Sequence, residues 1–217
     1  IRRANKQFEL FNYAEAIPLY LKAIEKNNDK VTPEAIQKLA DCYRLTNNGA
    51  EARIWYEKST RLPNADAGDY FFLGQALRTL GEYDAAAQAF KTFNKKEPGN
   101  TKGEQFYKYC IEIDDWLSEP DWAELKNVSS INSKYSDFGP AFFKNGIVFS
   151  SDRKTEDFVD KTYGWTNFSY LNLFYSEPEY TGYYWSAMTE PVSMERNFNQ
   201  TYHDGPAFFT NNDRLVY

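Results

Sequence analysis

The chain has 217 residues and is acidic, with 25 Lys and Arg against 31 Asp and Glu and a formal net charge of −6. This balance argues against a nucleic-acid-binding protein, because binding to phosphates needs clustered Lys and Arg. The sequence holds no apolar run of about 18 residues, so we expect no transmembrane helix. The hydrophobic fraction of 42% is that of a protein with one or two ordinary cores.

The sequence begins at Ile1 inside a helical pattern and ends at Tyr217 in a run typical of a strand. We therefore expect the chain to be part of a longer protein. Any targeting signal would then lie outside these residues.

The segment Tyr70–Pro98 has the pattern of two packed helices joined by a turn. Gly74 and Ala86 are small enough for two helices to touch, and Phe90 fills the space beside them. Gly81 marks the turn, because glycine adopts a left-handed backbone without a steric penalty. The segment is therefore predicted to be one helix-turn-helix unit.

Two earlier segments repeat this pattern. The residues that match Gly74, Ala86 and Phe90 are Ala40, Ala52 and Tyr56, and before them Ala4, Ala16 and Tyr20. A helix pair repeated at this period resembles the tetratricopeptide repeat. The second copy departs at its turn, which reads Asn47-Asn48-Gly49. We predict a tetratricopeptide array over residues 1–119, in which the amphipathic stretch Glu104–Leu117 is a single capping helix.

Cys42 and Cys110 fall on different helices of the predicted array, one whole repeat apart. Packed helices lie about 8–10 Å apart, whereas a disulfide needs Cα atoms within about 7 Å. We therefore expect two free, buried thiols.

The resemblance to tetratricopeptide repeats implies a groove lined by the first helix of each pair. The residues expected to face it are Gln37, Asp41, Arg44, Phe71, Gln75 and Arg78. Asp41 and Phe72 stand where the chaperone-binding members carry a clamp for a terminal carboxylate, so a cytosolic co-chaperone is disfavoured. A mixed, partly aromatic groove suits an extended protein segment or another domain, and the alternative is a spacer without a partner.

From Asp121 the helical period ends, and short aromatic and β-branched runs predict antiparallel strands at Gly146–Ser151, Leu171–Tyr175 and Tyr183–Ala187. A second repeat is present in this half. Asn132, Tyr135, Asp137, Gly139-Pro140 and Ala141-Phe142-Phe143 recur as Asn199, Tyr202, Asp204, Gly205-Pro206 and Ala207-Phe208-Phe209. Sheet units that return at this spacing favour a β-propeller, with the first blade and the start of a second in residues 120–217.

The run from Ser136 to Arg153 resembles the WD-like, TolB-type propeller repeat. A tetratricopeptide array followed directly by such a repeat is similar to the periplasmic OmpA-family lipoproteins of Bacteroidetes, among them the PorE-type component of the type IX secretion system. The segment Tyr163–Glu177 matches the first-blade pattern of that group. The resemblance implies a multidomain fold, α then β, with a peptidoglycan-binding OmpA-like domain beyond these residues.

Residues that suggest chemistry have simpler interpretations. His203, Ser136, Asp137 and Asp204 lie in the repeated turn, but the sequence has no G-x-S-x-G elbow, and Ser136 takes the place of His203 in the other copy. Asp152, Glu156, Asp157 and Asp160 lack the spacing of a calcium loop. We expect no catalytic residue, metal or cofactor, and the repeated Asp is predicted to accept backbone amides in a turn.

Trp165 and Phe168 lie in a long, polar link that precedes the strand at Leu171. Aromatic residues on such a link are candidate anchors for a partner, because Trp and Tyr dominate interface hot spots. The alternative is that the link folds over the helical array and only completes its packing.

The resulting hypothesis is a non-enzymatic periplasmic scaffold that binds protein partners, including an outer-membrane complex, and reaches peptidoglycan through the missing C-terminal domain. The alternative is a propeller-bearing hydrolase whose catalytic domain follows these residues, because similar blades accompany peptidases.

Overall fold

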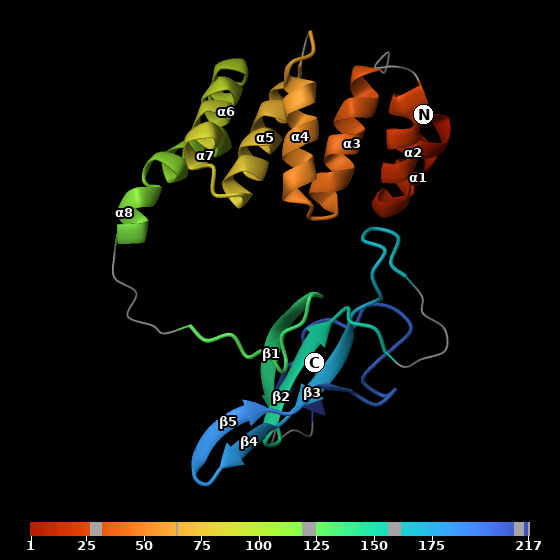
Figure 1. Cartoon of the computed structure of the whole chain (residues 1–217), viewed down its shortest axis with the longest axis vertical. Coiled ribbons are helices and arrows are strands. Elements are labelled where there is room, and N and C mark those ends of the chain that lie inside the picture. The colour runs from red at the N-terminus through yellow and green to blue at the C-terminus, as the bar shows by residue number, and fades with distance from the viewer. Residues whose placement is uncertain (27–31, 64, 119–124, 156–161, 211–214, 217) are drawn as a thin grey trace. The chain divides into compact units, whose positions relative to one another are not determined.

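The computed structural model describes residues 1–26, 32–63, 65–118, 125–155, 162–210 and 215–216. The chain divides into two compact units, shown in Figure 1. Unit 1 comprises Ile1–Trp122 with Gly164–Thr166, and unit 2 comprises Ala123–Tyr163 with Asn167–Tyr217. The boundary predicted at 119–120 falls outside the described residues.

Unit 1 is helical and packs its helices as successive pairs (Figure 1). Its elements are α1 (Arg2–Glu9), α2 (Tyr13–Lys26), α3 (Pro33–Leu45), α4 (Gly49–Thr60), α5 (Ala67–Thr79), α6 (Tyr83–Lys96), α7 (Thr101–Ile111) and α8 (Ile113–Ser118). Each helix packs mainly on its neighbours in the sequence, as in a repeat array. The predicted helix pairs are confirmed.

The three pairs share one turn geometry. The second residue after the first helix has a left-handed backbone in each, with φ of 60° at Phe11, 59° at Asn47 and 77° at Gly81. In each turn the next backbone N–H donates to a carbonyl five residues earlier, for example from Glu82 to Leu77 at 2.9 Å. This bond ends a helix in the Schellman manner. The second turn therefore keeps the repeat geometry although its sequence departs from the pattern.

Small residues lie at the helix crossings, as the repeat alignment predicts. Ala4, Ala16, Ala40, Ala52, Gly74 and Ala86 are all buried. Gly74 faces Phe90, and a Cβ atom at this position would lie 2.7 Å from two atoms of the Phe90 ring. The crossing of α5 and α6 therefore requires glycine.

The capping segment differs from the single helix that the sequence predicts. It is split into α7 and α8 around Glu112, and only its first half packs on α6. Phe106 stacks on Phe90 and Cys110 is buried, whereas Leu117 is exposed. The stripe of apolar residues therefore does not stay on one buried face beyond Cys110.

Cys42 and Cys110 are free and buried. Burial, with a smaller effect of Asp41, raises the pKa of the Cys42 thiol to about 12. Burial also raises the pKa of Cys110. We expect neither to react with a thiol reagent in the native chain at pH 8, because the reactive thiolate is scarce and shielded. Both should react after denaturation without reductant, and recovery of fewer than two thiols would contradict this packing.

Unit 2 is built on an antiparallel sheet in the order β1-β2-β3-β6. Its strands are β1 (Asp137–Phe143), β2 (Gly146–Ser151), β3 (Asn172–Ser176) and β6 (Val192–Ser193). Two separate hairpins accompany it, formed by β4 (Pro178–Thr181) with β5 (Tyr184–Met188) and by β7 (Phe209–Thr210) with β8 (Leu215–Val216). The strand predicted at Tyr183–Ala187 therefore belongs to a hairpin, and not to the main sheet.

The strands alternate their faces as the sequence predicts. Leu173 is buried in one cluster with Phe143 and Val148, and Tyr175 packs against this cluster. Phe174 lies on the opposite face, where its ring stacks with Phe149 at 6.3 Å. The sheet is thus apolar on both faces.

The repeated turn has the same hydrogen bond in both copies. The backbone N–H of Ser133 donates to Asp137 Oδ2 at 2.6 Å, and that of Gln200 donates to Asp204 Oδ2 at 2.7 Å. The two copies also touch, because a Cβ atom at Gly139 would lie 2.7 Å from Pro206 Cβ. The predicted role of the aspartate in fixing a turn is confirmed by this geometry.

The predicted β-propeller is not formed by the residues that the structure describes. They form one four-stranded sheet and two short hairpins. A propeller arranges about four to eight such sheets around an axis. A single sheet with part of a second repeat cannot close this ring.

Candidate functional site

The first helices of the pairs, α1, α3 and α5, together with α7, form what we call the first-helix face. The six residues predicted to line it are all half-buried. Three of them make hydrogen bonds within unit 1. Gln37 Nε2 donates to Asp69 Oδ1 at 3.0 Å, and Arg44 donates to Asp41 Oδ1 and to the Tyr56 hydroxyl, both at 3.0 Å. The middle repeat therefore uses its polar groups to hold the array together.

Asp69 and Tyr56 are the buried partners in these contacts. Ser59 Oγ donates to Asp69 Oδ2 at 2.8 Å, and the Tyr56 hydroxyl donates to Asp41 Oδ1 at 2.6 Å. Burial raises the pKa of Asp69, although hydrogen bonds from Ser59 and Gln37 oppose it. Burial, followed by the charge of Asp41, raises the pKa of Tyr56. A buried polar group without a partner is costly, so these bonds are structural.

Phe71 lies inside an aromatic cluster between helices. Its ring centroid is 5.7 Å from that of Phe90, 5.1 Å from that of Phe93 and 5.4 Å from that of Phe106. Such edge-to-face and tilted contacts stabilise the interior of a protein. The structure thus places Phe71 in the packing of α5, α6 and α7.

Arg78 and Gln75 remain available at the end of the array. The Arg78 guanidinium lies over the Phe106 ring at 4.8 Å from the centroid. Within the described ranges, neither the Arg78 guanidinium nor the Gln75 side chain has a hydrogen bond or ion pair. Of the six predicted residues, those with unmet hydrogen-bonding capacity among the described residues are therefore Gln75 and Arg78, in the third repeat.

Arg78 borders a pocket of about 500 Å³, which we call the Arg78 pocket. Its lining residues are Arg78, Thr79, Tyr83, Tyr109, Ile113 and Trp116. Trp116 is 64% exposed and meets Tyr109 edge to face at 6.0 Å. Among the residues described, the pocket therefore combines a cation that has no counter-ion with the exposed ring of Trp116.

The sequence analysis did not identify this pocket. Tyr109 lies 34 residues after Gln75, so the repeat period could have placed it on the same face. Ile113 and Trp116 could not be placed, because their position depends on the break between α7 and α8.

Trp165 packs within unit 1, to which Gly164–Thr166 belong. Its indole Nε1–H donates to the Leu45 carbonyl at 2.5 Å. Its ring meets Tyr13 edge to face at 4.9 Å and stacks on Phe11 at 6.5 Å. Trp165 thus satisfies its polar group and much of its apolar surface internally.

Phe168 belongs to unit 2 and is 45% exposed. Its ring meets Tyr135 edge to face at 6.0 Å. It borders a pocket of about 360 Å³ that also includes Lys134 and Lys154. Phe168 and Trp165 therefore belong to different units of the chain.

We expect the substitution Trp165→Ala to lower the free energy of unfolding of unit 1 by about 2 kcal/mol, because it removes an aromatic cluster and a hydrogen bond. Urea denaturation followed by far-ultraviolet circular dichroism measures the change. The matched substitution Phe168→Ala should leave the helical transition unchanged. Equal effects of the two substitutions would contradict the assignment of Trp165 to the packing of unit 1 and of Phe168 to unit 2.

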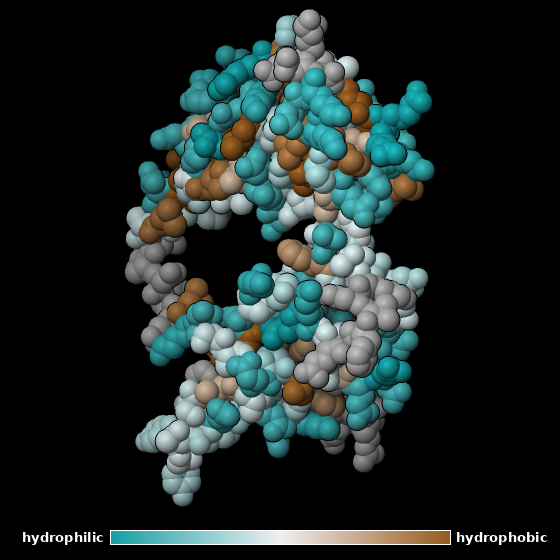
Figure 2. Space-filling model, turned by 45° about the vertical axis from the view of Figure 1, so that its right-hand side comes forward, coloured by the Kyte–Doolittle hydropathy of each residue, from teal (hydrophilic) through white to brown (hydrophobic). Residues whose placement is uncertain are grey.

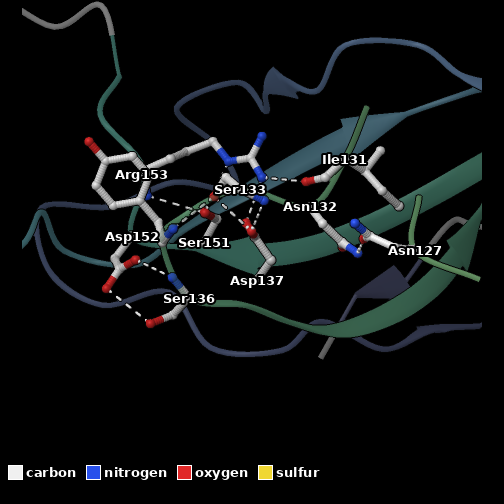
Figure 3. A network of polar contacts seen from close by, with 10 residues as sticks. Asn127, Ile131, Asn132, Ser133, Ser136, Asp137, Ser151, Asp152 and Arg153 are labelled. Carbon is white, nitrogen blue, oxygen red and sulfur yellow. Dashed lines mark hydrogen bonds and ion pairs between the residues drawn. The ribbon is translucent and has the colours of Figure 1, made fainter. Parts of the chain in front are cut away.

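Ser136 and Asp137, two of the polar residues that suggested catalysis, belong to a structural network in unit 2 (Figure 3). Arg153 Nη2 donates to Asp137 Oδ1 at 2.5 Å and to the Ile131 carbonyl at 2.6 Å. The Ser136 backbone N–H donates to Asp152 Oδ1 at 2.7 Å. These bonds tie the turn before β1 to the end of β2.

His203 also makes a structural contact. Its Nδ1 accepts a hydrogen bond from the Leu171 backbone N–H at 3.0 Å, and its ring packs edge to face on Tyr163 and Tyr170. Among the residues described, no group of three or more His, Cys, Asp or Glu side chains is arranged to hold a metal ion. Most of the acidic cluster, at Glu156, Asp157 and Asp160, lies outside the described residues.

No helix in the described ranges is both long and apolar enough to cross a bilayer.

Comparison with known proteins identifies the helical repeats. Tetratricopeptide repeat models match residues 1–67 and 70–94. The repeats predicted from the sequence are confirmed, and unit 1 contains a tetratricopeptide array of the kind that mediates protein–protein interactions. No curated protein matches the chain.

Solved structures that match part of the chain include tetratricopeptide proteins from three organisms. The Sgt2 domain of Aspergillus fumigatus is 20% identical, with a TM-score of 0.46, and the match covers 58% of this chain and 85% of that one. The C-terminal domain of an FK506-binding protein of Plasmodium falciparum is 16% identical, with a TM-score of 0.47, and the match covers 54% and 88%. The C-terminal part of a tetratricopeptide protein of Cytophaga hutchinsonii is 21% identical, with a TM-score of 0.43, over 54% and 45%.

Proposed function

We propose that unit 1 is a protein-interaction module that binds an extended protein segment at the Arg78 pocket. The observation that carries this proposal is the half-buried Arg78, which has no counter-ion in the described part of the chain, beside the exposed ring of Trp116. An arginine in this setting is a strong donor to a carboxylate. Exposed Trp and Tyr are the residues that anchor interfaces.

The chemistry of the pocket defines the segment that fits it. A carboxylate would bind the Arg78 guanidinium, and neighbouring apolar side chains would cover Tyr109, Ile113 and Trp116. The middle repeat contributes less, because Asp41 and Arg44 pair with each other at 3.0 Å. The ligand is therefore an acidic segment with apolar neighbours.

We propose further that the chain is part of a non-enzymatic scaffold in the periplasm of Bacteroidetes. Its partner would be an outer-membrane complex, such as that of type IX secretion, and an OmpA-like domain beyond these residues would bind peptidoglycan. The resemblance of the segment Ser136–Arg153 to TolB-type repeats supports this proposal. The four-stranded sheet β1-β2-β3-β6 would be the first propeller blade, because blades are four-stranded antiparallel sheets.

Affinity recovery from solubilised outer membranes of a Bacteroidetes bacterium tests the proposed function. The wild-type chain should recover a membrane protein, and the double substitution Arg78→Ala, Trp116→Ala should lose it. The matched double substitution Lys91→Ala, Lys95→Ala removes exposed charges from α6 and should have no effect. Equal recovery by both variants would reject the Arg78 pocket as the binding site, and recovery only from the cytosolic fraction would reject the envelope location.

A further inference from the structure

The β4–β5 hairpin projects from the main sheet of unit 2 (Figures 1 and 2). Its strands pair from Pro178 with Met188 to Thr181 with Tyr184. Gly182 makes the turn with a φ of 66°. At the base of the hairpin, Met188 is buried, so the tip is the part that extends into solvent.

Three tyrosines at this tip are exposed to solvent. The exposed fraction is 64% for Tyr180, 101% for Tyr183 and 82% for Tyr184. Single exposed aromatic residues are common on protein surfaces and need no explanation. Three within five residues, on a projecting hairpin, are more than such scattered residues explain and are typical of an interaction site.

The charge around the hairpin has one sign. Residues 162–195 contain no Lys, Arg or His and have glutamates at positions 177, 179, 190 and 195. By the strand register, Glu179 shares a face with Thr181 and Tyr184. In the part of the chain that the structure describes, the Glu179 carboxylate has no ion pair or hydrogen bond. The hairpin therefore presents the Tyr184 ring on the same face as an available carboxylate, with Tyr183 at the turn and Tyr180 on the other face.

We propose that the β4–β5 hairpin binds an arginine-bearing segment of a partner protein. A guanidinium plane stacks on a tyrosine ring by cation–π attraction, and its N–H groups can donate to the Glu179 carboxylate. A lysine ammonium offers the charge without the planar stacking surface. The acidic character of the hairpin disfavours an anionic lipid surface as its ligand. This surface belongs to unit 2 and does not depend on the Arg78 pocket.

The probe for this proposal is a fluorescein-labelled peptide of alternating Arg and Gly, titrated into the full chain at 0.15 M salt. Matched peptides replace Arg by Lys or by Glu. The triple substitution Tyr180→Ser, Tyr183→Ser, Tyr184→Ser should weaken binding of the arginine peptide at least about ten-fold. Glu179→Gln should weaken it about three-fold. Tyr202→Ser, at another exposed tyrosine of unit 2, should leave it unchanged.

Three results would overturn the proposal. The first is no binding of the arginine peptide by the wild-type chain, and the second is equal binding by the triple variant. The third is equal affinity for the arginine and lysine peptides, which indicates only attraction to the net charge of −6. Sedimentation with phosphatidylcholine vesicles completes the test, because binding to them that depends on the tyrosines would assign the hairpin to lipid instead. Circular dichroism of each variant verifies that the fold is retained.

Discussion

The substitution Gly74→Leu will lower the free energy of unfolding of unit 1 by about 3 kcal/mol, because it overpacks a helix crossing. The first added atom, Cβ, would lie 2.7 Å from Cε1 and Cζ of Phe90. Phe90 is fully buried and stacks on Phe106 at 5.4 Å, so its ring cannot move aside freely. The strain would therefore pass from α5 to both α6 and α7.

The matched control for this substitution is Gly68→Leu in the same helix. A Cβ atom at Gly68 would meet nothing closer than Phe72 Cε2 at 4.0 Å. Urea denaturation followed by circular dichroism should show a large decrease in the free energy of unfolding for Gly74→Leu and a small change for Gly68→Leu. Equal stability of the two variants would contradict the repeat alignment.

The second large effect is expected at Asp137. Its substitution by Asn should destabilise unit 2 by about 3 kcal/mol, because it leaves the Arg153 guanidinium without its counter-ion. The two side chains are mostly buried, with exposed fractions of 9% for Asp137 and 15% for Arg153. The same carboxylate accepts hydrogen bonds from the backbone and hydroxyl of Ser133 (Figure 3).

Asp204 provides the matched control, because it occupies the same position in the second copy of the turn. It accepts the Gln200 backbone N–H at 2.7 Å, but no ion pair to it occurs within the described residues. Hydrogen exchange of the β1 and β2 amides should accelerate strongly in Asp137→Asn and weakly in Asp204→Asn. Equal acceleration would show that the turn, and not the ion pair, carries the stability.

The Asp137–Arg153 pair also predicts a pH dependence. Burial alone would raise the pKa of Asp137, but hydrogen bonds from Arg153, Ser133 and Ser151 outweigh it and lower the pKa below its usual value. A carboxyl with a lower pKa in the folded state contributes stability above the unfolded pKa of about 4 and loses it as the pH falls through the folded pKa. Below about pH 4, the stability of unit 2 should therefore fall more steeply in wild type than in Asp137→Asn.

The helical array could be predicted from the sequence because its repeats constrain the same positions three times. Gly74, Ala40 and Ala4 lie at equivalent crossings, and each is buried. The turn residues were harder to predict, because Phe11 adopts a left-handed backbone that its residue type disfavours. That conformation accompanies the helix-ending hydrogen bond from the Asn12 N–H to the Gln7 carbonyl at 2.9 Å. The break between α7 and α8 carries no glycine or proline, so no local signal marked it.

The sheet unit was predictable in its strands but not in its assembly. Alternating runs located β2 and β3, whereas β1 includes Gly139 and Pro140 and does not resemble a strand. The hairpin β4–β5 pairs locally around Gly182, which periodicity alone cannot separate from the main sheet. A propeller depends on contacts between blades, and one repeat with part of a second cannot display them.

The candidate site, too, could be predicted only in part from the sequence. The repeat period placed Arg78 and Gln75 on the correct helix, but it could not show that Asp41 and Arg44 pair with each other. It placed Phe71 on the groove face, but it could not show that the half-buried ring also packs against Phe90, Phe93 and Phe106. Whether a side chain is free for a partner depends on its neighbours from other helices, which a single-helix pattern does not contain.

Photo-cross-linking from the Arg78 pocket tests the central claim most directly. p-Benzoylphenylalanine is placed at position 109, inside the pocket, or at position 91, exposed on α6, and each full-length chain is irradiated with solubilised outer-membrane proteins. The proposed function predicts a cross-linked partner from position 109 alone, attached through a segment that contains Asp or Glu beside apolar residues. Cross-links of equal yield from both positions, or none from position 109, would contradict it.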